Sequence, residues 1–234
     1  WPALRQGFVD LVPEYAGSSL DAAASLPGPS GGERGTVPDD VGVVVGRLRA
    51  VVEPWGLTVL RPARAANENV VVVREADARR HDLVTVGDLA AVAPGAGLGG
   101  PLECPARPRC LVGLRETYGL DFGRFVPLAG EDLVRRALED GVIDAGVLFS
   151  TDASLSGSGL VVLEDDRGLQ AADNVVPLLR REAATPTVVE VLDEVSGRLG
   201  TADLRLLDWR LANAGTTEAA EARAWLIRRG LVER

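Results

Sequence analysis

The stretch ALRQGFVDLVPEYAG (residues 3–17) has a similar counterpart later in the chain, ALEDGVIDAGVLFST (residues 137–151). In both copies an Ala-Leu pair leads to a glycine, two apolar residues and an aspartate, and an aromatic residue, Tyr15 or Phe149, stands eight positions after the glycine. The glycine is typical of a helix C-terminus, and the apolar run after it predicts a short strand. We therefore expect two similar lobes that each present one ring to a shared cleft, although core positions for both rings are an open alternative.

The composition is that of a globular protein. Of the 234 residues, 46% are hydrophobic and 25% are charged, which excludes wholesale disorder. The formal charge of −9 argues against a nucleic-acid partner, because nucleic acids select basic surfaces. No run is long enough to cross a membrane. The chain has no methionine and opens on Trp1 within a predicted helix, so we expect that the natural N-terminal segment is missing.

Apolar periodicity and turn residues predict alternating strands and helices. The strands are predicted at residues 8–12 (ended by Pro13), 56–60, 69–74, 159–166 and 174–181, with a loop at residues 25–36. The helices are predicted at residues 38–54, 85–93 with Thr85 as the cap, 132–140, 188–199 with Thr187 and Glu190 as a capping box, 201–214 and 217–229. This alternation predicts an α/β fold with mostly parallel sheets.

The two cysteines lie in the proline-rich segment LECPARPRC, as Cys104 and Cys110. A tight loop between them favours a disulfide and hence an extracytoplasmic protein, while two free thiols in a cytosolic protein are the alternative. A zinc site is disfavoured, because His81 is the only histidine and two thiolates do not complete a tetrahedral set.

No segment carries a recognisable catalytic set. The glycine-rich GAGLGG (residues 95–100) lacks the lysine of a phosphate-binding loop. His81 lies in a charged helical run, where it is expected to be solvated. The acidic run Glu164-Asp165-Asp166 ends a predicted strand and is typical of a solvated turn. We therefore predict no enzyme activity, no cofactor and no metal.

Several segments together resemble one family. VDLVPEYAGSSL, GLRETYGLDF, ALEDGVIDAGVLFSTD, LEDD and LRLLDWRLANAG resemble the substrate-binding proteins of osmoprotectant ABC importers, which bind glycine betaine, choline, carnitine and proline betaine. The resemblance implies an α/β, two-lobed periplasmic-binding-protein-like fold of type II, with two hinge crossovers and mixed sheets flanked by helices. It places one lobe at residues 1–65 plus 172–234 and the other at residues 66–171. It also implies a monomer outside the cytoplasmic membrane, lipid-anchored through the missing segment, with a membrane permease as its partner.

The resemblance also implies a ligand site. The family surrounds a quaternary ammonium with aromatic residues, and Tyr15 and Phe149 match two of them. Asn69 and Asp173 stand where two further rings are usual, which favours a different solute, such as a choline-like cation or a larger hydroxylated molecule. The other residues carried over are Arg107, which matches an arginine that holds a ligand carboxylate, and Ser18, Asn67, Ser150 and Thr151 from the same motifs.

Two other classes of protein remain open at this level. A ligand-sensing domain of a transcription regulator shares the two-lobed architecture, but the cysteine pair and the absence of a DNA-binding segment count against it. An enzyme on the same scaffold is disfavoured by the lack of a usable histidine, metal cluster or nucleophile.

Overall fold

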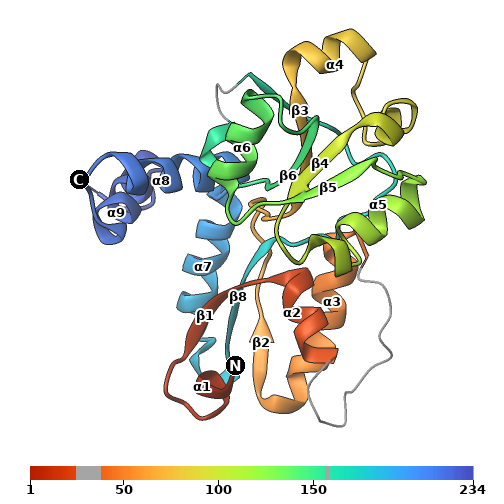
Figure 1. The fold of residues 1–234 in the computed structure, drawn as a ribbon. Coiled ribbons are helices and arrows are strands. Elements are labelled where there is room, and N and C mark those ends of the chain that lie inside the picture. Colours follow the sequence, from red (N-terminus) through yellow and green to blue (C-terminus); the bar gives the residue numbers. More distant parts are fainter. Residues whose placement is uncertain (25–37, 156–158, 234) are drawn as a thin grey trace. The chain divides into compact units, whose positions relative to one another are not determined.

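The computed structural model describes residues 1–24, 38–155 and 159–233, so the loop predicted at residues 25–36 lies outside the described residues. Its internal contacts divide the chain into two compact units (Figure 1). Unit 1 comprises Trp1–Asn67 and Ala171–Arg234, and unit 2 comprises Glu68–Gln170. The chain therefore passes from one unit to the other twice.

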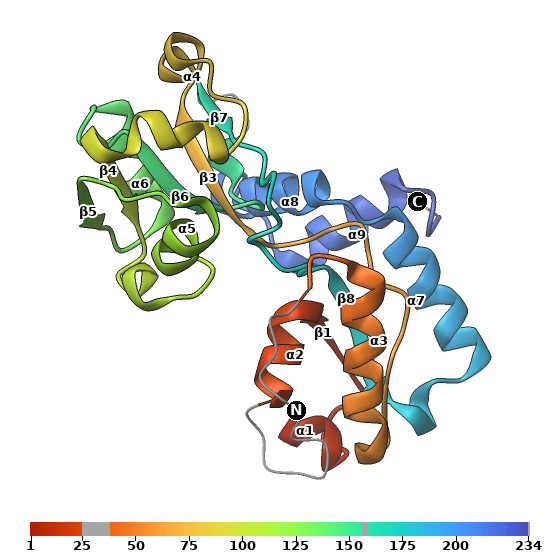
Figure 2. The same ribbon diagram turned by 90° about the vertical axis from the view of Figure 1, so that its right-hand side faces the viewer.

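Unit 1 is built on an antiparallel sheet with the strand order β1-β8-β2. Figure 2 shows α3 and α7 beside β8, the central strand, and α2 packs against α3. Apolar side chains from these elements form the core, among them Val44, Leu48, Val176 and Leu178. The elements of unit 1 are α1 (Pro2–Arg5), β1 (Leu11–Tyr15), α2 (Ala16–Ala24), α3 (Val41–Val52), η1 (Glu53–Trp55), β2 (Leu57–Val59), β8 (Val175–Arg180), η6 (Arg181–Ala183), α7 (Pro186–Arg198), α8 (Thr201–Asn213) and α9 (Glu218–Arg228).

Unit 2 is built on a mixed sheet with the strand order β5-β4-β6-β3-β7. The β4–β5 and β4–β6 pairs are parallel, whereas β3 is antiparallel to both of its neighbours. Alternate valines of β3 enter two cores: Val71 and Val73 pack with α5, and Val72 packs with α6. The elements are β3 (Asn69–Arg74), α4 (Glu75–His81), η2 (Gly87–Ala91), η3 (Ala93–Gly95), β4 (Gly97–Gly100), η4 (Cys104–Ala106), α5 (Leu111–Tyr118), β5 (Arg124–Pro127), α6 (Glu131–Glu139), β6 (Ala145–Phe149), η5 (Ala153–Leu155) and β7 (Leu160–Val162).

The sheets correct two expectations. The expectation of mostly parallel sheets is wrong, because both pairings in unit 1 and both pairings of β3 are antiparallel. The first strand does not end at Pro13 but runs through it to Tyr15. Proline is tolerated there because β1 is an edge strand, which needs no ladder bond on its outer side.

Helix starts also differ from the expected positions. Thr185, not Thr187, caps α7, and its side chain accepts a hydrogen bond from the amide of Val188. Pro186 explains the shift, because proline is favoured at the first helical position, directly after the cap. The helix expected from residue 38 begins at Val41, with Asp40 as its cap.

The two similar sequences fold alike. In the first copy, α1 ends two residues before Gly7, and β1 ends on Tyr15. In the second, α6 ends two residues before Gly141, and β6 ends on Phe149. Both glycines are left-handed, with φ of 75° and 70°, a conformation that favours glycine. The predicted repeat of helix end, strand and aromatic residue is confirmed.

Each copy is also fixed by an arginine from the neighbouring strand. Asp10 and Asp144 stand three residues after the two glycines. Asp10 pairs with Arg180, the last residue of β8, at 3.6 Å, and Asp144 pairs with Arg74, the last residue of β3, at 3.4 Å. We call these two pairs the Arg–Asp staples.

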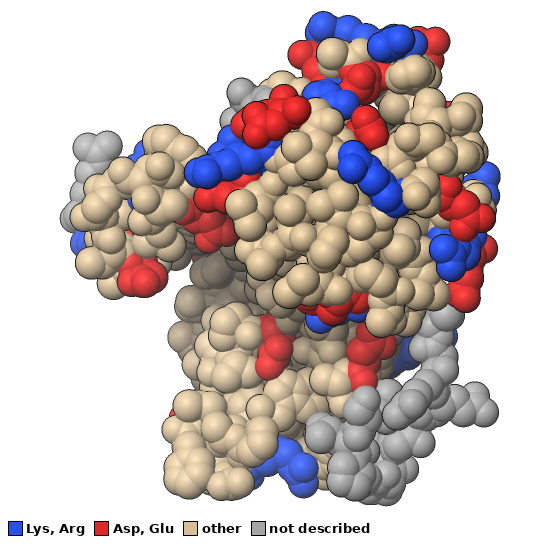
Figure 3. All heavy atoms as spheres, in the orientation of Figure 1, with Lys and Arg blue, Asp and Glu red and all other residues tan. Residues whose placement is uncertain are grey.

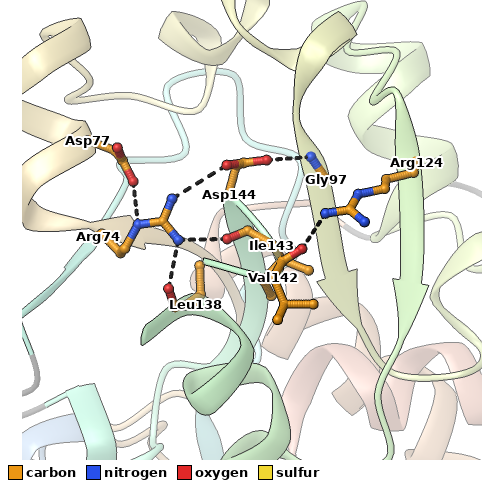
Figure 4. A network of polar contacts seen from close by, with 8 residues as sticks. All are labelled: Arg74, Asp77, Gly97, Arg124, Leu138, Val142, Ile143 and Asp144. Atoms are coloured by element: carbon orange, nitrogen blue, oxygen red, sulfur yellow. Dashed lines mark hydrogen bonds and ion pairs between the residues drawn. The ribbon is translucent and has the colours of Figure 1, made fainter. Parts of the chain in front are cut away.

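Figure 4 shows the staple of unit 2 in full. The Arg74 guanidinium also donates to the carbonyls of Leu138 and Ile143, at 2.6 and 2.7 Å. Asp144 accepts a second bond, from the amide of Gly97 in β4 at 2.8 Å. The turn around Gly141 is thereby held to two strands of its sheet.

The described residues contain no helix that is both long and apolar enough to span a bilayer.

Candidate ligand-binding site

In unit 1, the predicted residues Tyr15, Ser18 and Asp173 lie together. The antiparallel pairing of β1 with β8 sets Tyr15 opposite Val175, so the end of β1 lies beside the residues that precede β8. Ser18, in the first turn of α2, donates to the Asp173 carboxylate twice, from its amide at 2.9 Å and from its hydroxyl at 2.6 Å. Asp173 is half-buried and occupies the N-terminus of α2.

The surroundings of Tyr15 are acidic. Burial and the nearby carboxylates of Asp208 and Asp173 raise the pKa of the Tyr15 hydroxyl, against a hydrogen bond from the Asn67 side chain that lowers it. The predicted residue Asn67 is therefore a direct partner of Tyr15. Asp208, from α8, is a further acidic neighbour of Tyr15 that the sequence did not indicate. We call Tyr15, Ser18, Asn67, Asp173 and Asp208 the acidic patch.

In unit 2, the predicted residues Asn69 and Phe149 form a cross-strand pair, at the start of β3 and the end of β6. Phe149 is 40% exposed, so this ring is not a core residue. The side-chain amide of Asn69 donates to the backbone carbonyl of Arg109 at 3.3 Å. The ring and the amide therefore stand at one end of the β3–β6 ladder, and the Arg–Asp staple stands at the other.

Ser150 and Thr151, which follow Phe149, are both buried. Ser150 donates its amide to the carbonyl of Glu68 at 2.7 Å, and its hydroxyl accepts from the Glu68 amide at 3.0 Å. Ser150 therefore extends the β3–β6 pairing past Phe149 and fixes the backbone at Glu68, directly before β3. These bonds give Ser150 a positioning role for the ring before it.

The predicted disulfide between Cys104 and Cys110 is confirmed, and both cysteines are buried. The loop between them is tied to the rest of unit 2 at Arg109, whose carbonyl accepts from Asn69 and, at 3.1 Å, from Gln170. Arg107, the expected partner of a ligand carboxylate, is exposed and pairs with Glu103 at 3.2 Å.

A cavity of about 270 Å³ opens beside the Asn69–Phe149 pair, wholly within unit 2. Its walls come from the segments after β4 and β5, the start of α6 and the end of β6. Figure 3 shows that the surface over β5 and its neighbouring strands is largely uncharged, with acidic and basic side chains around it. The lining residues are Asn69, Pro101, Leu102, Glu103, Leu128, Ala129, Gly130, Glu131, Val134, Val147, Leu148 and Phe149.

The residues that the sequence analysis considered for catalysis lie at the surface or take part in structural hydrogen bonds. His81 is exposed at the end of α4. Asp165 accepts from the Tyr118 hydroxyl and from the amides of Leu169 and Gln170, so it orders the segment that leads back to unit 1. Burial, followed by this bond to Asp165, raises the pKa of Tyr118. Among the residues that the structure describes, no group of three or more histidines, cysteines or acids could hold a metal ion.

Known proteins are similar to this chain in sequence and in structure. A glycine-betaine-binding protein of Pseudomonas aeruginosa is 28% identical over 231 residues, which cover 89% of this chain and 68% of that protein. The crystal structure of a glycine betaine/carnitine/choline ABC transporter has a TM-score of 0.84 at 21% identity, with 98% of this chain and 82% of that chain covered. Apo YehZ from Escherichia coli has a TM-score of 0.78 at 23% identity, with 99% and 84% covered.

The structural likenesses confirm the predicted fold class, an α/β fold of the periplasmic-binding-protein kind. The sequence profile described as the substrate-binding domain of the ABC-type glycine betaine transport system matches residues 1–228. This family consists of extracytoplasmic transport proteins and not of enzymes. Its members bind small ligands and work with membrane permeases. The chain thus belongs to the family of substrate-binding domains of ABC-type glycine betaine transport systems.

Proposed function

We propose that this substrate-binding domain takes an organic cation without a carboxylate, with choline as the simplest example, and delivers it to the permease of an ABC importer. The observation that carries the proposal is the acidic patch of unit 1, where two carboxylates, Asp173 and Asp208, lie close enough to Tyr15 to raise its pKa. A cation gains from both carboxylates and from the face of the ring.

The N-terminus of α2 also favours a cation over a ligand that carries a carboxylate. A helix N-terminus attracts anions through its free amides and its dipole. In this chain Asp173 already accepts from the Ser18 amide at that position. A ligand carboxylate placed there would meet a like charge, whereas an ammonium would meet an opposite one.

Arg107, in unit 2, also argues for a ligand without a carboxylate. Its guanidinium pairs with Glu103, an acid four residues earlier, and both side chains are largely exposed. A ligand carboxylate would have to compete with Glu103 for this arginine. We therefore give Arg107 a role in the disulfide loop and not in holding the ligand.

The polar side chain beside each ring favours a cation that also carries a hydroxyl. Asn67 reaches the Tyr15 hydroxyl, and Asn69 stands beside Phe149, so an amide accompanies each ring. Amides offer both donors and acceptors, which match a hydroxyl better than a fully methylated ammonium.

Calorimetric titration of the full chain with choline and with glycine betaine tests the proposal. Choline should bind the wild type more tightly than glycine betaine. Asp173→Asn keeps the shape and an acceptor for Ser18 but removes the charge. Because Asp173 is half-buried, choline affinity should fall about tenfold, near the low end of charge-pair couplings.

Glu190→Gln is the matched control, since it makes the same change of charge at an exposed position of α7 in unit 1. It should leave the affinity for choline unaltered. Tight binding of glycine betaine that is indifferent to Asp173→Asn would overturn the proposal.

The monomeric state and the lipid anchor stay predictions. Sedimentation of the purified chain tests the first, and mass spectrometry of the protein extracted from native membranes tests the second.

A further inference from the structure

Unit 2 holds a second cavity, of about 310 Å³, at the end of the β3–β6 ladder where the Arg–Asp staple lies. Its walls come from β3, α4, the segment after α4, η2, η3 and the start of β6, and it shares no lining residue with the cavity beside Phe149. We call it the α4 cavity. An apolar cavity of about 150 Å³ already accepts benzene, so this one has room for a single ring.

Most of the lining of the α4 cavity is apolar and belongs to the core of unit 2. Val73, Leu83, Leu89 and Ala145 line it, and they are members of one buried cluster against which Val92 also packs. Apolar surface that borders an open cavity stays in contact with water, and an apolar ligand would remove it from water. The walls therefore favour a ligand with an apolar body.

The acids of the α4 cavity already share one arginine. Figure 4 shows Asp77 and Asp144 on two sides of the Arg74 guanidinium, which pairs with them at 2.5 and 3.4 Å. An ammonium ligand would have to compete with Arg74 for these carboxylates, and a carboxylate ligand would meet their negative charge. The pairing therefore favours an uncharged ligand.

Two polar side chains of α4 can bind one hydroxyl. Asp77 and His81 stand four positions apart, on one face of the helix, with Cβ atoms about 5–6 Å apart. Within the described residues the imidazole of His81 has no hydrogen-bond partner, and Asp77 uses only Oδ2, toward Arg74. A hydroxyl can donate to Oδ1 of Asp77 and accept from a ring N–H of His81, whereas an ammonium only donates and a carboxylate only accepts.

An unusual turn places His81 at the cavity. Asp82, directly after it, has a left-handed φ of 52°, the one such value outside glycine in the described part of the chain. Aspartate adopts this conformation more readily than most residues. The amides of Asp82 and Leu83 both donate to the carbonyl of Ala78, so α4 ends and the chain turns back. His81 and Leu83 thereby line the same cavity.

We propose that the α4 cavity binds a small, uncharged aromatic alcohol, with its ring against the apolar lining and its hydroxyl between Asp77 and His81. None of the residues that carry the proposed function belongs to this cavity. The two proposals can therefore fail independently of each other.

Nuclear magnetic resonance of the full chain tests the site, because the chain has one histidine and the imidazole signals report on His81 alone. Benzyl alcohol should shift these signals in a saturable manner. Val92→Phe places a ring in the lining from a half-buried position and should abolish the saturable shift. Val84→Phe makes the same change at an exposed position outside the lining and should keep it.

Calorimetry tests the class of ligand. Benzyl alcohol should bind more tightly than benzylamine or benzoate, and His81→Ala should weaken its binding about fivefold, the effect of one hydrogen bond. Gly95→Leu is a second variant that adds bulk to the lining, since an added Cβ there meets open space, and it should weaken binding too. Circular dichroism verifies that each variant is folded.

Four results would overturn the inference while the choline proposal stands. They are the absence of a saturable shift in the wild type, a shift that survives in both Val92→Phe and Gly95→Leu, an affinity that His81→Ala leaves unchanged, and tighter binding of benzylamine or benzoate than of benzyl alcohol.

Discussion

Opening the Cys104–Cys110 disulfide should destabilise unit 2 by a moderate, calculable amount. The bond closes a loop with a sequence separation of six, and the chain-entropy relation gives about 2 kcal/mol for a loop of this size. For a chain of this length, that corresponds to a fall in melting temperature of about 4–8 °C. Scanning calorimetry of the wild type and of the Cys104→Ala/Cys110→Ala variant measures it.

The same change should weaken ligand binding, because the disulfide loop holds the Arg109 carbonyl that accepts from Asn69. A loop with more freedom would leave the Asn69 amide without a fixed partner beside Phe149. The double variant should therefore bind choline more weakly even at temperatures where it is fully folded.

A reductant provides the control. It should lower the melting temperature of the wild type, once thiol titration shows that the bond is open, and should leave that of the double variant unchanged. Equal melting temperatures for the oxidised wild type and the double variant would refute the loop-entropy reasoning. Equal affinities would refute the coupling to Asn69.

Two other predictions concern stability. Gly141→Ala should lower the free energy of unfolding by about 1 kcal/mol, because of the left-handed φ alone, since the added Cβ would meet open space. Gly7→Ala should lower it further, because its Cβ would lie 2.5 Å from Nη1 of Arg180, and urea unfolding of both variants tests this order. Burial acts to raise the pKa of Asp203, but hydrogen bonds, among them the one from Arg229, outweigh burial, and the net pKa is lowered. The charge of Asp203 therefore stabilises the fold at neutral pH, and this stabilisation is lost as the pH falls below about 4. Asp203→Asn should therefore lower the free energy of unfolding by about 2 kcal/mol at neutral pH and by progressively less in acid, and a stability profile against pH that runs parallel to that of the wild type would contradict this reasoning.

Local sequence signals predicted the repeated segments well. The glycine after each helix and the apolar run after it act over a few residues, so Gly7 and Gly141 could be placed without knowledge of the sheet. The Arg–Asp staples could not be predicted, because Arg180 is 170 positions from Asp10, and only the strand order brings them together. Strand direction escaped prediction for the same reason, since periodicity does not distinguish parallel from antiparallel partners.

Within each unit, residues that the sequence singled out lie together. Asn69 and Phe149 are cross-strand neighbours in unit 2, and Ser18 bonds Asp173 in unit 1. Asp208 was missed because it lies on α8, where a charged residue on an exposed helix gives no signal by itself. The cavity beside Phe149 was missed because its walls come from four separate segments, and no single one of them is unusual in sequence.

The architecture of each unit separates binding from stability. In both units an antiparallel strand pair has its Arg–Asp staple at one end, and an aromatic ring beside a polar residue at the other. Along an extended strand, Asn69 stands about 16 Å from Arg74, and Asp173 about 23 Å from Arg180. Both distances exceed the range of about 8–10 Å over which exposed charges act in physiological salt. Changes at Asn69 or Asp173 can therefore alter ligand choice without weakening the staples. Because Asp173 also accepts two bonds from Ser18 at the N-terminus of α2, the melting temperature of Asp173→Asn must be compared with that of the wild type before a lost affinity is assigned to binding.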